Sequence, residues 1–294
     1  MRIGSEHTIF SLSASHPPAA RAVSGDKVTF ETLDCFSNTV KNARDVVSGI
    51  DFSKVNPATG PLFVEGAQPG DILKVSIQAI RVAKQGVVVA APGLGQLAGL
   101  VEQEETVVCA VSETEADYLG IRLPLRKMVG VIGTAAEGEG ISTGTPDRHG
   151  GNLDTLRITE GSIVYLPVNV EGALLALGDL HAVMGNGEVM GSGLEICGEV
   201  DVVVEVLKDV SLPLPFVETE QLYISLASDQ NLERACQKAV EQMARFITDH
   251  TTLSLNQAGM FLSLAGHLVA SQVVNPQRTM RVEVEKALLE SVRK

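Results

Sequence analysis

The stretch that decides the fold is Ile196-Cys197-Gly198-Glu199-Val200-Asp201-Val202-Val203-Val204-Glu205-Val206. Its even-numbered positions are apolar or small, whereas its odd-numbered positions are mostly polar. Successive side chains of a β-strand point to opposite faces, so this period of two predicts a long strand with one buried and one polar face. The segment therefore predicts a sheet that packs one face on a core.

Shorter strand-forming runs precede this segment and are separated by turns. Residues 73–79 alternate between apolar and polar after the turn Pro69-Gly70-Asp71. Other such runs lie at 27–33, 87–91, 107–111 and 162–168. Helical periodicity is scarce before residue 229. Short strands with frequent turns are typical of a β-sandwich or β-barrel body.

The pattern changes at Leu212-Pro213-Leu214-Pro215, which we interpret as a boundary. The sequence therefore predicts a mainly β protein with an α+β C-terminal portion. We divide it into a β-rich body at 1–208, expected to carry the catalytic site, and a C-terminal portion at 209–294 packed on that body.

Helices and one strand are predicted in the C-terminal portion. Apolar residues recur at helical spacing over 232–247, and Asp229 is the expected N-cap of that helix. Ser254 and Gln257 predict a capping box for a second, shorter helix. An alternating run at 280–284 predicts a strand, and we expect a last helix to close the chain.

Composition excludes several classes of function. With 294 residues, of which 45% are hydrophobic, the chain can bury a sizeable core. Its net charge of −13 repels phosphate backbones, and it has no Trp and only 3 Tyr, so nucleic acid is an unsuitable partner. We expect no membrane association, because no apolar run approaches the ~20 residues of a membrane span and no signal peptide is recognisable. Four scattered cysteines favour reduced thiols and hence a cytoplasmic protein.

Groups that can bind a metal or move a proton gather in Gly-rich segments. His149-Gly150-Gly151-Asn152-Leu153-Asp154 is followed by Gly178-Asp179-Leu180-His181, and then by Glu188 and Glu195. Polar residues on loops that are framed by strands are typical of a catalytic site.

Asp179 and His181 lie two residues apart, so their side chains share a face on an extended segment. They can bind one Zn²⁺-type ion together, or the carboxylate can orient the imidazole that binds it. A surface histidine, or a buried one bonded to the backbone, fits the same residues. Asp154 can likewise end an Asx-turn, and Asp34 can cap the turn after its strand.

Two glutamates compete for the role of general base. Glu195 directly precedes the apolar strand at 196–206, where desolvation would raise its pKa toward the range that a base needs. Glu188 follows Gly185-Asn186-Gly187, on a loop that we expect to be more solvated. A solvated loop glutamate is the alternative interpretation for either residue.

A covalent mechanism would require an activated cysteine. Cys35 follows Asp34 and has no nearby Lys or His in the sequence, so its environment does not favour a thiolate. Cys197 is predicted inside a strand. We keep the covalent mechanism as the weaker alternative.

Taken in order, several segments resemble the acetamidase/formamidase family of amide hydrolases. The most specific runs from Gly178-Asp179-Leu180-His181 through Gly187-Glu188 to Glu195. The resemblance extends from about residue 7 to about residue 285 and includes Phe30-Glu31-Thr32, Asp34-Cys35-Phe36-Ser37-Asn38, Asn56-Pro57-Ala58-Thr59-Gly60-Pro61, Glu65-Gly66-Ala67-Gln68-Pro69-Gly70-Asp71, Gly150-Gly151-Asn152-Leu153-Asp154, Val170-Glu171-Gly172-Ala173-Leu174 and Ser271-Gln272-Val273-Val274-Asn275-Pro276. Family members often have Asp where Asn186 stands and variable residues where His149 stands.

The resemblance implies a β-rich fold with an α+β portion, a homodimer or larger even homo-oligomer, and hydrolysis of short aliphatic amides to a carboxylate and ammonia. It also implies a divalent metal ion, with Zn²⁺ favoured and Ca²⁺ as the alternative. The implied residues are the metal ligands Asp34, Asp154, Asp179 and His181, the base Glu195 with Glu188 as its competitor, and the substrate-binding residues Asn38, Asn152 and Glu65.

On this interpretation the metal activates water, and Glu195 passes the proton of that water to the departing nitrogen. The few aromatic residues and the many Gly, Ala and Val suggest a small acyl pocket that suits formamide or acetamide. The rival interpretation is a non-enzymatic β-sandwich binding protein with a structural Ca²⁺ bound by oxygen atoms alone. A histidine among the ligands would instead favour a transition metal.

Overall fold

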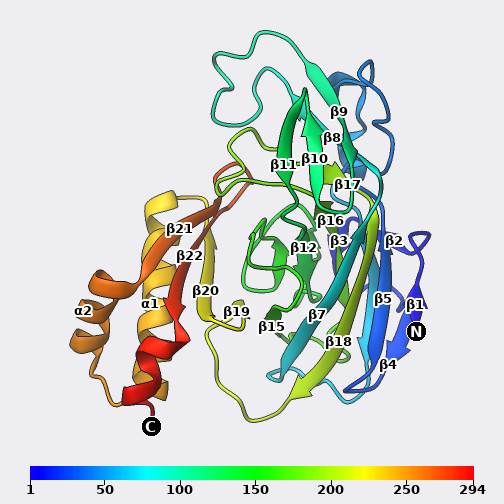
Figure 1. Cartoon of the computed structure of the whole chain (residues 1–294). Coiled ribbons are helices and arrows are strands. Elements are labelled where there is room, and N and C mark those ends of the chain that lie inside the picture. Colours follow the sequence, from blue (N-terminus) through cyan, green and yellow to red (C-terminus); the bar gives the residue numbers. More distant parts are fainter.

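The computed structural model describes residues 1–294, and most of its strands form two large β-sheets (Figure 1). The nine-stranded sheet has the order β1 (Arg2–Ile3), β5 (Lys27–Thr32), β18 (Gly198–Leu207), β7 (Ile72–Val82), β15 (Ile163–Pro167), β19 (Phe216–Glu218), β20 (Leu222–Asp229), β22 (Arg278–Glu285) and β21 (His267–Gln272). The eleven-stranded sheet follows the path β11 (Ile121–Pro124), β10 (Glu115–Tyr118), β9 (Glu105–Val111), β8 (Gln85–Ala90), β17 (Glu195–Ile196), β16 (Leu175–His181), β12 (Met128–Gly133) and β14 (Gly150–Asn152), and β6 (Ala58–Val64) joins β2 (Thr8–Ile9) and β4 (Ala20–Ala22) to β16. A separate pair is formed by β3 (Ser11–Leu12) and β13 (Ile141–Ser142).

The two large sheets share one hydrophobic core. Val200 and Val202 of β18 belong to the same buried cluster as Leu175 and Leu177 of β16. The strand order closes neither sheet into a barrel. The mainly β prediction is therefore confirmed, and the body consists of packed sheets.

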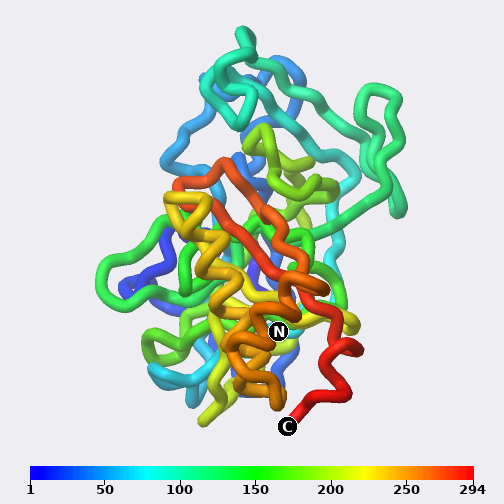
Figure 2. The backbone as a smooth tube through the Cα atoms, turned by 90° about the vertical axis from the view of Figure 1, so that its left-hand side faces the viewer, coloured from blue at the N-terminus to red at the C-terminus, as the bar shows by residue number.

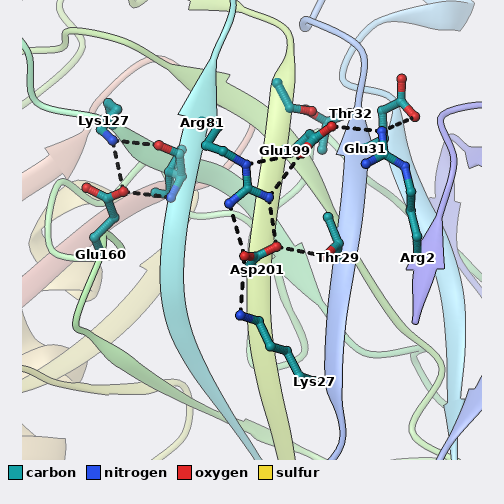
Figure 3. Close-up of polar contacts among 12 residues, drawn as sticks. Arg2, Lys27, Thr29, Glu31, Thr32, Arg81, Lys127, Glu160, Glu199 and Asp201 are labelled. Atoms are coloured by element: carbon teal, nitrogen blue, oxygen red, sulfur yellow. Dashed lines mark hydrogen bonds and ion pairs between the residues drawn. The ribbon is translucent and has the colours of Figure 1, made fainter. Parts of the chain in front are cut away.

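The polar face of β18 is paired with charges on the neighbouring strands (Figure 3). Arg81 of β7 lies 3.0 Å from Glu199 and 2.8 Å from Asp201. Hydrogen bonds from Arg81 and Thr29 hold the pKa of Asp201 far below its ordinary value. Arg2 of β1 reaches Glu199 at 2.7 Å. The period of two in the sequence thus separates a buried face from a face of ion pairs.

The C-terminal portion continues the nine-stranded sheet, because β19 pairs with β15 of the body. Its two α-helices, α1 (Leu232–His250) and α2 (Leu255–Ala265), lie at one side of the molecule (Figure 1). α1 packs Ala239, Met243 and Phe246 into a second core with the strands of this portion. The division at residue 208 stays a prediction, since one sheet crosses it.

One helix cap differs from the sequence-based expectations. Asp229 does not cap α1, because β20 pairs with β22 as far as Asp229, and Asn231 accepts the N–H of Arg234 instead. The last segment is a 3₁₀-helix, η3 (Lys286–Val292), as are η1 (Val47–Gly49) and η2 (Phe52–Lys54). The capping box of Ser254 and Gln257 is confirmed. None of the helices has the length and apolar character needed to cross a membrane.

Candidate metal and active site

Asp179 and His181 lie on β16, whose seven residues are all buried within the eleven-stranded sheet. Asp179 has a left-handed backbone, with φ of 55°, and the register of β16 against β12 skips this residue. Its carboxylate lies beside the imidazole, with Asp179 Oδ1 at 3.5 Å from His181 Nε2. The two side chains therefore converge, as their spacing predicts.

Strand β17 places Glu195 opposite His181, its partner in the sheet. Glu195 Oε2 lies 3.1 Å from His181 Nε2, and Glu195 Oε1 accepts the backbone N–H of Gly193 at 2.8 Å. Gly193 passes so close to His181 that a Cβ atom on it would lie 2.6 Å from Nδ1. Sheet pairing and this glycine position the carboxylate and the imidazole together.

Asp154 and Glu188 approach His181 from two further segments. One ligand atom from each of these three residues lies within 4.8 Å of the others. Asp154 and Glu188 both have a left-handed backbone, with φ of 40° and 45°. Such a conformation costs on the order of 1–3 kcal/mol and clusters at functional sites. Asn275 holds Asp154 in place, because its Nδ2 donates to Asp154 Oδ2 at 2.6 Å.

Cys35 forms a second group with Asp179 and Glu195, again with ligand atoms within 4.8 Å of one another. Burial, together with the negative charges of Glu195 and Asp179, raises the pKa of the Cys35 thiol well above its ordinary value. Gly130 of β12 lies beside both groups, since a Cβ atom on it would be 2.6 Å from the carboxylates of Asp154 and Asp179. The close approach of these side chains therefore depends on a glycine at this position.

The cluster concentrates four carboxyl groups and one imidazole away from solvent. Burial raises the pKa of Glu188 and Glu195, and burial with the charge of Asp179 raises the pKa of Asp154 to about 7. Burial alone would lower the pKa of His181, but the charges of Glu195 and Asp179 outweigh it and raise that pKa well above its ordinary value. The cluster can hold its full negative charge only with protons or a cation.

Unpaired oxygen atoms point to a missing positive partner. Buried side-chain polar atoms are normally hydrogen-bonded. The carboxyl groups of the cluster each keep one buried oxygen without a hydrogen-bond partner: Asp154 Oδ1, Asp179 Oδ1, Glu188 Oε2 and Glu195 Oε2. The oxygens of Asp154, Asp179 and Glu188 can bind a cation, whereas Glu195 Oε2 lies 3.1 Å from His181 Nε2.

Three of the predicted site residues lie outside this cluster. Asp34 Oδ1 accepts the N–H groups of Phe36 and Asn38, which is the turn-capping role considered as its alternative. Asn38 Oδ1 accepts the N–H of Asp34 in return. Glu65 pairs with Arg21 at 2.9 Å on the surface. The roles of Asp34, Asn38 and Glu65 in binding stay predictions.

Asn152 and His149 are both buried, but they differ in position. Asn152 lines the same cavity as the cluster, and its Oδ1 has no partner. His149 does not belong to either ligand group, and burial lowers its pKa to about 4. Glu188 is the more exposed of the two glutamates, as expected, but both are buried, at 7% for Glu188 and 2% for Glu195.

The C-terminal portion closes over the loop that carries Glu188. The N–H of Gly187 donates to Ser271 O at 2.8 Å, and the buried Arg281 donates to Asn186 Oδ1 at 2.8 Å.

Sequence analysis assigned no role to Asn275 or Arg281. The available signals were the Asn-Pro pair at 275–276 and a charged residue within the alternating strand at 280–284.

The cluster opens into a cavity of about 340 Å³. Part of the lining is polar, from Asn56, Ser142, Thr145 and Asn152, and another part is apolar, with Phe36, Val47, Ile50, Phe52, Val89 and Leu94. The small acyl pocket stays a prediction, and the segment at 36–55 contributes side chains that composition could not place at the site.

The chain is similar to known proteins over most of its length. The acetamidase/formamidase family model matches residues 14–139 and 134–285. The chain is 47% identical to a solved acetamidase from Bacillus halodurans, with a TM-score of 0.97 and 99% coverage of both chains. It is 44% identical to a predicted acetamidase/formamidase of known crystal structure from the thermophile Thermoanaerobacter tengcongensis. The TM-score is 0.95, and the match covers 99% of this chain and 97% of the other.

Curated relatives are more distant in sequence. The formamidase of Methylophilus methylotrophus is 24% identical over 314 residues, which cover 78% of this chain and 77% of that protein. The chain spans 63% and 64% of the length of two other curated relatives, each 26% identical to it.

Proposed function

Because the chain belongs to the acetamidase/formamidase family, we propose that it hydrolyses short aliphatic amides to a carboxylate and ammonia with a divalent metal ion. The observation that carries the proposal is the buried cluster around His181, with one unpaired oxygen on each of its four carboxyl groups. Clustered ionisable groups with raised pKa values in a cavity are typical of a catalytic site.

The donor set fits a transition metal. We place the ion among Asp154, His181 and Glu188, whose ligand atoms lie within 4.8 Å of one another, with Asp179 as a further ligand because its Oδ1 is unpaired and lies 3.5 Å from His181 Nε2. A nitrogen donor favours Zn²⁺ over Ca²⁺, which prefers oxygen alone. When bound, such an ion polarises the amide carbonyl and lowers the pKa of water. Asp34 is left out of this set, because its Oδ1 already accepts two backbone N–H groups.

Glu195 is the proposed general base. One of its oxygens is oriented by the N–H of Gly193, while Oε2 lies 3.1 Å from His181 Nε2, beside the proposed metal ion and its water. The raised pKa of Glu195 suits a group that must accept a proton and then donate it to the departing nitrogen. An amide resists hydrolysis because its nitrogen is a poor leaving group until it is protonated.

A covalent cysteine mechanism has less support. Cys35 lies close enough to contact the reacting atoms, but the acidic groups around it raise the pKa of its thiol. The nucleophilic form is the thiolate. We therefore propose that the Cys35 thiol is a neutral neighbour of Glu195. All four cysteines are free, as we expect in the reducing cytoplasm that we propose for this protein.

The non-enzymatic alternative is a binding protein with a structural Ca²⁺. Ammonia release from formamide and acetamide separates the two functions, with metal content measured on the same sample. We expect ammonia and carboxylate in equal amounts, and we expect chelation to abolish their release. If the protein binds Ca²⁺ tightly and hydrolyses no amide, the binding function takes the place of the hydrolase. If full turnover survives chelation and Cys35→Ser is inactive, the covalent mechanism is correct.

A further inference from the structure

We infer that the preferred substrates are neutral amides whose apolar acyl chain is longer than that of acetamide. The inference rests on the proposed amide hydrolysis and concerns the same cavity. Its basis is a patch of apolar side chains beside the carboxylate cluster. This acyl wall consists of Phe36, Val47, Ile50, Phe52, Val89 and Leu94.

The cavity is larger than formamide or acetamide requires. A water molecule takes about 30 Å³ of liquid volume, and acetamide is only a few times larger. The cavity of about 340 Å³ is therefore not filled by such a substrate, even beside an ion and its water. Cavities that bind ligands of this larger size are lined by apolar side chains with a few polar groups, as this one is.

Four residues of the acyl wall, Phe36, Val47, Ile50 and Phe52, belong to a loop that is closed at its base. The N–H of Asn56 donates to Cys35 O at 2.8 Å, and Ser37 Oγ donates to Lys54 O at 2.6 Å. The middle of the loop is tied to the segment before β9, because Ser48 Oγ donates to Glu104 at 2.6 Å. These hydrogen bonds fix the loop, so the wall can bind an acyl chain without a further loss of conformational freedom.

The acyl wall also continues an existing hydrophobic cluster. Phe36 and Val89 belong to a buried cluster, and Val47, Ile50 and Leu94 pack against it. Phe52 is 66% exposed and lines the cavity, which places it at the mouth. The wall therefore leads from the buried cluster toward solvent, along the path that a longer acyl chain would take.

The charges of the cavity exclude ionised substrates. No Lys or Arg lines it, and its ionisable lining residues other than Cys35 are the histidine and acids of the cluster, Asp179, His181, Glu188 and Glu195. A carboxylate at the far end of a substrate's acyl chain would meet no Lys or Arg along the acyl wall. A neutral apolar chain needs no ionic partner and is not repelled by the acids.

The test is the ratio of kcat/KM between pentanamide and acetamide, with propanamide and butanamide between them and succinamate as the charged probe. Each added CH₂ that reaches the wall should raise kcat/KM about fourfold, the usual gain from burying one methylene. Ile50→Ser should reduce the pentanamide-to-acetamide ratio several-fold. Leu264→Ser, at an exposed position of α2, is the matched control and should leave the ratio unchanged.

Other outcomes separate this inference from the proposed function. If acetamide is hydrolysed but kcat/KM falls steadily with chain length, or if succinamate is the best substrate, the acyl wall does not bind the acyl chain. If no amide is hydrolysed, the proposed function fails, and titration calorimetry with the same amides decides the inference. Affinity that rises with chain length and is reduced by Ile50→Ser would support the wall, and affinity independent of chain length would overturn it.

Discussion

Glu195 and Glu188 are both buried near His181, but only Glu195 has one oxygen oriented by a backbone N–H and the other 3.1 Å from the imidazole. We predict that Glu195→Gln lowers kcat by roughly 10²–10⁴-fold, the usual contribution of a general acid–base group. KM should change little, because the lost interaction belongs to the transition state. Steady-state kinetics with acetamide, alongside metal analysis of the variant, provides the measurement.

Glu188→Gln is the matched comparison for this experiment. Since we propose Glu188 as a metal ligand, its variant should lose metal as well as turnover, and added metal should restore part of the activity. If Glu188→Gln keeps its metal and loses kcat while Glu195→Gln stays active, the base has been assigned to the wrong carboxylate.

The buried imidazole of His149 contributes to the acid sensitivity of the protein. Its pKa is about 4 in the folded protein and ordinarily about 6.5, so between these values the unfolded chain binds a proton that the folded protein does not. Stability therefore falls as pH drops from 6.5 toward 4, by about 3 kcal/mol in all. His149→Gln should remove this slope in urea unfolding measured at pH 7 and pH 4.5. An unchanged difference between the two pH values would contradict this explanation.

Individual residues were predictable where local sequence decides their position. Asp179, His181 and Glu195 could be grouped from the spacing of a strand and the start of the next one. Asn275 could not be assigned, because its bond to Asp154 joins positions 121 residues apart. The burial of Glu188 depends likewise on the C-terminal strands that cover its loop.

At the scale of elements, the loop that carries Glu188 depends on the strand pair β21–β22. Asn186 accepts a hydrogen bond from the buried guanidinium of Arg281. Asn186→Leu leaves that donor unpaired, which should cost about 1–3 kcal/mol and lower both stability and metal affinity. Asn186→Asp keeps an acceptor and should retain both properties. Urea unfolding and metal titration of the two variants provide the test, and equal behaviour would show that the contact does not position the loop.

Periodicity in the sequence located the strands and helices, but tertiary contacts decide where they begin and end. The runs at 27–33 and 73–79 correspond to β5 and β7, because alternation is a direct record of which face is buried. The start of α1 was misplaced by two residues, since pairing of β20 with β22 extends the strand through Asp229. The left-handed backbone of Asp179, which interrupts the register of β16 against β12, was not predictable from alternation.

At the scale of the whole molecule, assembly is a separate prediction. The β10–β11 hairpin projects from the body (Figure 2), and β11 is an edge strand. Leu119 and Ile121 on this hairpin are exposed. Exposed apolar edges are commonly covered in symmetric oligomers, so we predict a homodimer or a larger even oligomer. Light scattering at micromolar concentration should exceed the 31.1 kDa of one chain, and a stable monomer would contradict the prediction.

The class of fold was predictable from the sequence, but the arrangement of the sheets was not. Turn spacing indicates many short strands without indicating which of them pair. The pairing of β15 with β19 joins the body to the C-terminal portion in one sheet, although composition changes sharply between them. The cavity arises from the same long-range arrangement, since the loop of the acyl wall reaches the cluster only in the folded protein.

The central claim, that a metal ion bound at the His181 cluster is required for amide hydrolysis, is tested most directly by zinc titration of metal-stripped protein. Bound zinc and ammonia release from acetamide should be measured on each sample, in wild type, His181→Ala and the control His149→Ala. We predict that wild type and His149→Ala gain activity in proportion to bound zinc, whereas His181→Ala binds little zinc and stays inactive. Full turnover by the stripped wild type, or normal zinc binding by His181→Ala, would contradict the account.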